Sequence, residues 1–308
     1  MSLLLPTLHV LLLLAMPILL IGVINRSKSW WVGRRGPGCL QSAWDLRRLW
    51  AKRAVLSSTA SVLFRCGPYV VLVASLLAAS MVPLLGRYAP LQFDYDFVVV
   101  AYTMGLGRML LMLCAMDVGS SFEGMGAARE ASFSAYAEPA LFILLGTACA
   151  ATGRSSFADV IGSLHGSPLF PYLLLPLLLA LFILLQTEAS RVPVDDPLTH
   201  LELTMVHEVM VPDHSGPELA TLQYAAALKL TLYAGLMASL LNPFDPLLEP
   251  LAAALASAAL MLGVALAVGC VESLTARLPM RWVPGYVLLA SSLGLAAMVL
   301  VGLGVGGP

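Results

Sequence analysis

The chain has 308 residues, of which 59% are hydrophobic and only 11% charged, with a mean hydropathy of +0.87 and a formal net charge of −1. Soluble domains are about 45–50% apolar and about 25% charged, so this composition excludes an ordinary soluble protein and indicates an integral membrane protein. The near-neutral balance gives no support for nucleic-acid binding. The five cysteines lie far apart without a C-x-x-C pair, which removes the usual spacing for zinc or an iron–sulfur cluster in this chain.

Eight segments are long and apolar enough to cross a bilayer, which takes about 20 residues as a helix. The first lacks a basic n-region and a convincing cleavage site before Asn25, so we expect a retained helix and not a signal peptide. The pattern predicts an all-α polytopic membrane protein, organised as a single integral membrane domain over residues 1–308. In chain order, the expected spans are 3–24, 68–85, 97–116, 136–151, 169–185, 222–241, 247–271 and 283–302, joined on the cytoplasmic side by structured loops at about 25–66, 117–135, 186–221 and 272–282.

The distribution of lysine and arginine predicts the orientation. The loop 25–66 holds more than half of the chain's basic residues, and basic loops remain in the cytoplasm. We therefore expect a multi-pass protein of the inner (cytoplasmic) membrane with both termini outside, and only Arg87 and Arg154 in the opposite loops. Acidic residues also gather on the cytoplasmic side, and this mixture of signs favours docking of a soluble partner over contact with anionic lipid alone.

Five ionisable residues lie within or at the ends of the expected spans. They are Arg108 in the third, Glu138 at the start of the fourth, Glu188 at the end of the fifth, Lys229 in the sixth and Glu272 at the end of the seventh. A charge at the centre of a membrane helix costs about 2.5–3.5 kcal/mol on insertion scales, so such groups usually face a protein interior or a water-filled cavity. Snorkelling of the side chain to the membrane surface is the alternative, above all for the two residues at span ends.

The loop expected at 117–135 contains Glu130 and three glycines, Gly119, Gly124 and Gly126. Glycine permits positive φ or a close backbone approach, which predicts a packed and shaped loop. A solvated connection with ordinary turn glycines is the alternative.

The stretch SRVPVDDPLTHLELTMVHE, residues 190–208, concentrates charge in a chain that otherwise has little. A metal site is disfavoured because Pro212 interrupts the seven-residue spacing of His200, His207 and His214, and there is no H-E-x-x-H arrangement. An acid/base pair is disfavoured because Asp195 and Asp196 are adjacent in sequence, and adjacent side chains usually point apart. A serine nucleophile is disfavoured because no nucleophile-elbow glycine pattern is present. What remains is a chain of titratable groups suited to proton passage and to coupling with a partner: Glu188, Arg191, Asp195, Asp196, His200, Glu202, His207 and Glu208. Arg191 follows Glu188 by three residues, so the two are expected to pair if the helix continues.

The segment TEASRVPVDDPLTHLELTMVHEVM closely resembles a loop in the membrane subunit of formate hydrogenlyase and related energy-converting nickel–iron hydrogenases. That subunit is similar to the quinone-chamber subunit of respiratory complex I. Three other segments carry the same resemblance in the same order: GRRGPGCLQSAWDLRRLW, FEGMGAARE followed by YAEP, and VESLTARLPMRWVPG. The resemblance covers nearly the whole chain, and the first segment is the most specific.

Ser190 and Val194 depart from the complex I branch, as do Leu198 and His200 where that branch carries glutamates, while Glu202 is kept; the form is the hydrogenase type. The resemblance implies that the loops at 186–221 and 117–135 face the hydrogenase large and small subunits. Those subunits hold the nickel–iron centre and iron–sulfur clusters, and no cofactor is expected in this chain. It implies antiporter-like neighbours in the membrane. It also implies that Glu138, Glu188 and their neighbours belong to a buried polar path.

The expected function is therefore that of a membrane-anchoring and proton-coupling subunit of a hydrogenase complex, itself without a catalytic centre. One alternative is the quinone-binding membrane subunit of an NADH dehydrogenase. Another is a stand-alone ion transporter, which is disfavoured because no internal inverted repeat is visible in the sequence.

Overall fold

The structure, a computed structural model, describes residues 3–57, 59–196 and 205–304, and these residues form helices and no strand. A segment inside a bilayer must satisfy its own backbone N–H and C=O groups, which a helix does. Eight helices in the described ranges are long and apolar enough to span a membrane: α1 (Leu4–Trp31), α3 (Val62–Met81), α4 (Asp96–Asp117), α5 (Ser121–Thr152), α7 (Phe170–Glu188), α8 (Gly216–Leu241), α9 (Pro250–Leu274) and α10 (Val283–Gly302). The shorter elements are α2 (Gln41–Trp50), α6 (Phe157–His165), η1 (Glu208–Met210) and η2 (Met280–Trp282). The predicted all-α polytopic class is confirmed.

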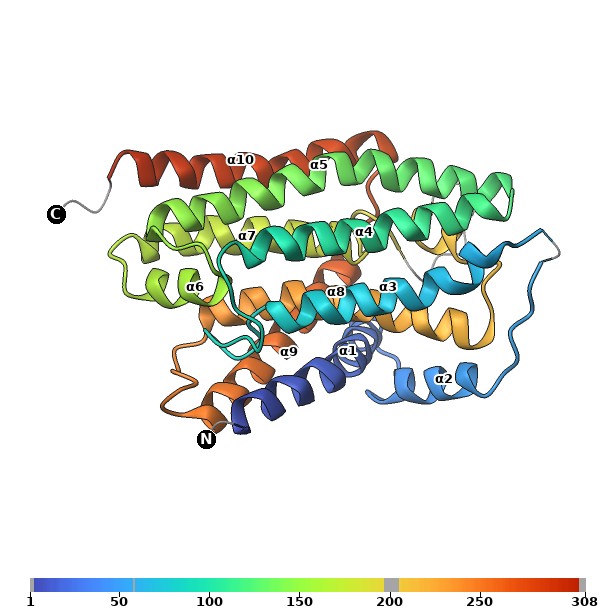
Figure 1. Cartoon of the computed structure of the whole chain (residues 1–308), viewed down its shortest axis with the longest axis horizontal. Helices are drawn as coiled ribbons and strands as arrows, with labels where there is room; N and C mark the ends of the chain where they lie inside the picture. The colour runs from blue at the N-terminus through green and yellow to red at the C-terminus, as the bar shows by residue number, and fades with distance from the viewer. Residues whose placement is uncertain (1–2, 58, 197–204, 305–308) are drawn as a thin grey trace.

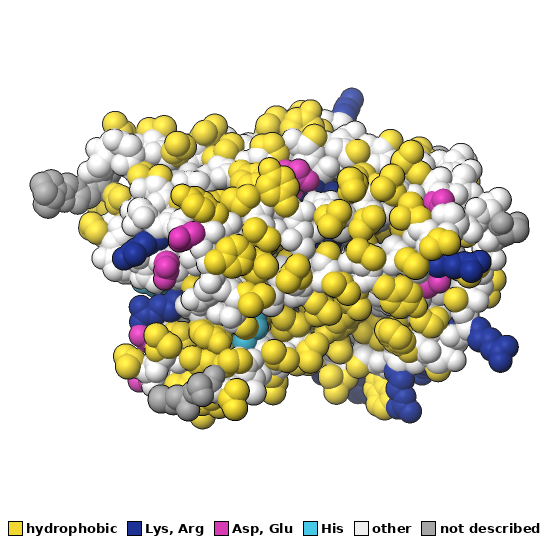
Figure 2. All heavy atoms as spheres, viewed as in Figure 1, with side chains coloured by type: hydrophobic (Ala, Val, Ile, Leu, Met, Phe, Trp, Pro, Cys, Tyr) yellow, Lys and Arg dark blue, Asp and Glu magenta, His cyan; other side chains and the backbone are white. Residues whose placement is uncertain are grey.

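The spanning helices run along the long axis of the molecule, and α1 begins at the same end at which α10 finishes (Figure 1). The first turns of α3, α5 and α8 lie at the opposite end. We call this the basic end, because exposed cations of the segment before α3 and of its first turn gather there: Arg47, Arg48, Lys52, Arg53 and Arg65. Figure 2 shows hydrophobic side chains covering the flank between the two ends, as expected for a surface that meets lipid.

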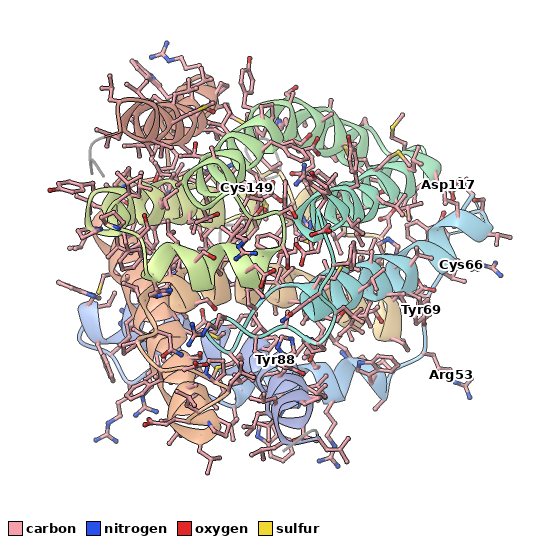
Figure 3. The ribbon with its side chains drawn as sticks, turned by 60° about the vertical axis from the view of Figure 1, so that its left-hand side comes forward. Arg53, Cys66, Tyr69, Tyr88, Asp117 and Cys149 are labelled. Atoms are coloured by element: carbon pink, nitrogen blue, oxygen red, sulfur yellow. The ribbon has the colours of Figure 1, made fainter. Side chains whose placement is uncertain are left out.

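Figure 3 shows residues of the basic end, where α3 and α4 are also joined by a hydrogen bond. Arg53, Cys66 and Asp117 lie on the same side of this view, with Tyr69 one turn further along α3. The backbone amide of Ser61, which precedes α3, donates to Asp117 Oδ2 at the end of α4 over 2.8 Å. This bond fixes the start of one span against the end of the next.

Helix α8 is the central helix of the bundle. Of its most apolar 18 residues 83% are buried, against at most 44% in any other span. It contacts α1, α3, α7 and α9, so almost none of its circumference faces lipid. Small residues permit this close packing: a methyl group at Gly235 would meet the side chains of Leu84 and Met261. Most polar side chains on this helix, Lys229 among them, are therefore directed into the protein.

The expected loop at 117–135 is in large part helix, because α5 begins at Ser121 and continues without a break to Thr152. The segment 121–135 contains four alanines, two glutamates, one methionine and one arginine, which favour helix, and this propensity outweighs its two glycines. Gly119 does have a positive φ of 77°, so it makes the turn between α4 and α5. Gly126 makes the predicted close approach, since a methyl group there would collide with Val209 and Met210.

Candidate functional site

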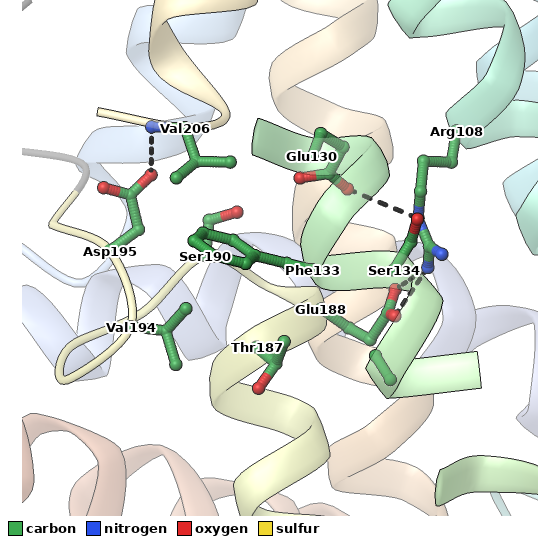
Figure 4. A pocket seen from close by; sticks show the side chains of 11 residues that line it. Arg108, Glu130, Phe133, Ser134, Thr187, Glu188, Ser190, Val194, Asp195 and Val206 are labelled. Carbon is green, nitrogen blue, oxygen red and sulfur yellow. Dashed lines mark hydrogen bonds and ion pairs between the residues drawn. The ribbon is translucent and has the colours of Figure 1, made fainter. Parts of the chain in front are cut away.

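Arg108 is the centre of a buried ion-pair network in the middle of α4. Its side chain is 5% exposed. The guanidinium contacts three carboxylates: Nε lies 3.3 Å from Glu130 Oε1, Nη1 lies 2.7 Å from Glu138 Oε1, and Nη2 lies 2.5 Å from Glu188 Oε2. Figure 4 shows Glu130 and Glu188 directed towards the guanidinium from α5 and α7. The planar guanidinium suits this role, because its five N–H donors are arranged in a fixed fork.

Local sequence explains how three helices meet at Arg108. Glu130 and Glu138 lie eight residues apart on α5, close to the spacing that returns to one helix face, so both reach the same guanidinium. Gly105 lies one turn before Arg108, and a methyl group there would be 3.6 Å from Glu138 Oε1. Glu188 is the last residue of α7, so its carboxylate is at the end of the span.

Lys229 and Tyr233 add a fourth helix to this site. Both lie on the buried helix α8, at 5% and 6% exposure. The Lys229 ammonium interacts electrostatically with Glu130 and Glu188, and the Tyr233 hydroxyl with Glu188 and Glu138. We call these residues the Arg108 cluster: Arg108, Glu130, Glu138, Glu188, Lys229 and Tyr233. With its three carboxylates, Arg108 and Lys229 ionised and Tyr233 neutral, the cluster holds three negative and two positive charges, so one bound proton makes it neutral.

Glu272 at the end of α9 forms a second network. Its side chain is fully buried and contacts Lys28 of α1 at 2.7 Å (Nζ–Oε2) and Arg191 at 3.6 Å (Nη1–Oε1). The expected pair of Arg191 with Glu188 is wrong, because α7 ends at Glu188 and Ser190 takes a positive φ of 49°. That turn directs Arg191 towards α9 and leaves Glu188 to Arg108. Burial of Glu188 and Glu272 also decides against snorkelling at both span ends.

Asp195 is buried inside the loop that follows α7, at 1% exposure. Its Oδ2 accepts the backbone N–H groups of Val206 and His207 at 3.0 and 3.2 Å, and its Oδ1 lies 2.9 Å from Arg277 Nη2. Figure 4 shows the hydrogen bond from Val206 to Asp195 in a pocket that Arg108 also lines. Burial raises the pKa of this carboxyl, and Arg277 and the amides oppose that shift. Asp195 therefore holds the loop together from within and is not an exposed docking charge.

The other candidate residues of this loop are half-buried or lie outside the described residues. Asp196 is half-buried, and its amide donates to Asp195 Oδ1 at 2.9 Å. His207 and Glu208 are half-buried at the start of η1, and burial, aided by the nearby Lys229 charge, lowers the pKa of His207 to about 3. The imidazole is thus neutral at ordinary pH. His200 and Glu202 lie outside the described residues.

The site predicted from the sequence did not include three buried ionisable residues near the basic end, Glu123, His214 and Glu218. His214 was considered only as part of the disfavoured metal site. One signal was available for Glu123, because it precedes Glu130 by seven residues and so shares its helix face. Burial of His214 and Glu218 depends on how α3 and α8 pack, which no local pattern reveals. Among the described residues, no group of three histidine, cysteine or carboxylate side chains is placed to hold a metal ion.

Comparison with known proteins adds to this description. The sequence profile of the NADH dehydrogenase family matches residues 4–302. Two proteins of Escherichia coli (strain K12) are similar. Hydrogenase-4 component C is 29% identical over 239 residues, or 76% of this chain and 73% of that protein. Formate hydrogenlyase subunit 4 is 28% identical over 236 residues, or 74% of each chain.

A solved structure has the same fold. A chain of the membrane-bound sulfane sulfur reductase, an archaeal respiratory membrane complex, superposes with a TM-score of 0.82 at 18% identity, covering 96% of this chain and 98% of that one. Fold and site together define a polytopic membrane protein with ion pairs buried among its spans. The chain belongs to the NADH dehydrogenase family, and the resemblance to hydrogenase-type membrane subunits and their complex I counterpart is confirmed.

Proposed function

We propose that this chain is the membrane-anchoring and proton-coupling subunit of a hydrogenase complex resembling formate hydrogenlyase. The observation that carries the proposal is the Arg108 cluster, in which one buried guanidinium contacts three carboxylates from two helices. Charges inside a membrane bundle are costly, and where they occur they commonly mark ion pathways. A site whose charge is balanced by taking up one proton suits such a pathway.

The carboxylates of the Arg108 cluster lie one after another, so they define a route for protons. Glu130 interacts electrostatically with Asp195 on one side and with Arg108 and Lys229 on the other. Glu188 shares Arg108 with Glu138, which lies deeper along α5. We therefore order the path from the loop after α7, through Glu130 and Glu188, to Glu138.

The exposure of Glu138 also argues for a partner subunit within the membrane. Its side chain is 50% exposed, although it lies in the middle of a long apolar helix and pairs with a buried arginine. A carboxylate facing lipid at that depth would cost about 2.5–3.5 kcal/mol. A partner membrane subunit that covers this part of α5 with polar groups would remove the cost and continue the path. An antiporter-like subunit, as the family resemblance implies, has this chemistry.

The basic end is the proposed attachment point for the peripheral subunits. It carries exposed arginines and lysines, and the described part of the loop after α7 is held by Asp195 and Arg277. The nickel–iron centre and the iron–sulfur clusters would belong to those partners, as the resemblance to energy-converting nickel–iron hydrogenases implies. Redox chemistry there would shift the position of this loop and so the charge balance around Glu130.

Purification through an affinity tag on this chain tests the proposal. In mild detergent we expect co-isolation of a nickel-containing hydrogenase subunit. The family description makes the quinone-binding subunit of an NADH dehydrogenase the second candidate. Recovery of an NADH-oxidising module would favour that candidate, and recovery of the chain alone would contradict both.

A further inference from the structure

Three buried ionisable residues between α3, α5 and α8 form a second site, which the path above does not use. We call Glu123, His214 and Glu218 the His214 cluster. His214 Nδ1 lies 3.6 Å from Glu218 Oε2, and Glu123 Oε1 accepts the backbone N–H of Asp213 at 3.3 Å. All three residues are at least 95% buried. Their burial is unexpected, because Glu123 and Glu218 lie in the first turns of α5 and α8 and His214 precedes α8, all near the basic end.

The surroundings of the cluster are mostly apolar. The ring of Phe64 on α3 stacks on His214 with centroids 3.8 Å apart and planes 5° from parallel. Cys114 of α4 interacts electrostatically with Asp117, Glu123 and Glu218, which lie on α4, α5 and α8. The charged groups that face the cluster are Arg65, which interacts with Glu218, and Asp213, which interacts with Glu123.

Several polar atoms of the cluster make no hydrogen bond among the described residues: Oε2 of Glu123, Oε2 of Glu218 and both ring nitrogens of His214. Burying a carboxylate without full pairing is costly, and binding a proton relieves that cost. Burial lowers the pKa of His214 to about 4, so the ring is neutral at ordinary pH. A neutral imidazole has one donor and one acceptor nitrogen, and can therefore pass a proton between two carboxylates.

An apolar contact separates this site from the Arg108 cluster. Glu123, Gly126 and Glu130 follow one another at spacings of three and four on α5, so they share a helix face, with the two carboxylates about 10 Å apart along the axis. The side chains of Val209 and Met210 rest on Gly126, between the two glutamates. They are 3% and 0% exposed. Element η1 thus fills the space through which a proton would travel.

We propose that the His214 cluster is a proton-binding site that supplies the Arg108 cluster, and that Val209 and Met210 of η1 close the connection between them. Movement of η1 away from Gly126 would open it. This proposal rests on the proposed coupling function, because it places the uptake of the transported proton. It adds Glu123, His214 and Glu218 to the path as groups that bind the proton itself.

Infrared difference spectroscopy tests proton binding independently of turnover. The purified complex is taken through a pH step in H2O and in D2O, and the carbonyl band of protonated carboxyl groups is recorded. We expect Glu123→Gln and Glu218→Gln each to remove a component of the band, while the control Glu249→Gln, at an exposed glutamate before α9, leaves it unchanged. In proteoliposomes the same two variants should slow redox-driven proton movement by about 100-fold, the size typical of a lost acid or base.

The outcomes separate the two proposals. An unchanged band in both variants would overturn the His214 cluster as a proton-binding site. Loss of the components in a complex whose wild type moves no protons would support the site and contradict only the coupling function. Loss of the components with wild-type proton movement would overturn the supply route.

Discussion

At the scale of single residues, the buried charges are partnered across helices and not with their neighbours in sequence. Arg191 contacts Glu272 on α9, and Glu188 contacts Arg108 on α4. Each pair joins two elements, so its loss affects packing as well as charge. A buried charge that loses its partner destabilises a protein much more than a broken surface pair does.

We predict that Glu272→Gln lowers the free energy of unfolding by about 3–5 kcal/mol, because it leaves Lys28 and Arg191 without the carboxylate that both contact. Thermal unfolding in detergent measures the change. Arg48→Ala, which removes the solvent-exposed pair with Asp45, is the matched control and should cost at most about 1 kcal/mol. Equal effects of the two substitutions would show that the Glu272 network adds no stability of its own.

A pH dependence follows from His214. The unfolded chain binds a proton near the ordinary pKa of 6.5, whereas burial in the folded protein lowers the pKa to about 4. The contribution of His214 to the free energy of unfolding is therefore at its maximum above about pH 6.5. It falls by roughly 3 kcal/mol as the pH is lowered towards 4. We predict that His214→Gln flattens the stability profile between these values. A steep profile that persists in the variant would assign the dependence to other groups.

At the scale of elements, η1 can pack against α5 because residue 126 is a glycine and has no side chain. Gly126 faces Val209 and Met210, whereas no atom lies within 4 Å of where a methyl group at Gly124 would be. Both glycines are in the interior of one helix, so alanine has the same intrinsic effect at either position. The difference in stability between the two alanine variants therefore measures the effect of the contact with η1.

We predict that Gly126→Ala displaces η1 and increases cleavage of the segment 205–215 by an added protease, because the new methyl group collides with both side chains. Gly124→Ala should instead stabilise the protein by up to about 1 kcal/mol through helix propensity. Limited proteolysis and thermal unfolding of the two variants provide the comparison. Protection of the segment in Gly126→Ala would contradict its seating on α5.

Elements and polar sites differ in how far sequence predicts them. The eight spans follow from runs of apolar residues, and charges within those runs correctly marked Arg108 and Lys229 as interior. The helical segment 121–135 was missed because it is too polar to register as a span and was taken with the loop before it. The partners of Arg191 and Asp195 were also missed, since a turn at Ser190 and the packing of α9 decide them.

At the scale of the whole molecule, the buried groups form a succession from the basic end into the bundle. The His214 cluster lies at the start of α8, and Lys229 of the Arg108 cluster lies three turns further along the same helix. Because α8 is enclosed by other spans, both sites are shielded from lipid, and Glu138 is the member of the Arg108 cluster that reaches the outer surface. Under the proposed function, this arrangement would connect peripheral subunits at one end with a membrane neighbour at the side.

The ratio of protons moved to electrons transferred, measured in proteoliposomes with the purified complex, tests the coupling role most directly. Wild type should move protons in step with hydrogen production. Glu188→Gln should retain dye-linked hydrogenase activity, because the proposed function assigns that chemistry to the peripheral subunits. It should lose most proton movement, because Arg108 loses one of its three carboxylates. An unchanged ratio in Glu188→Gln would contradict proton coupling through the Arg108 cluster.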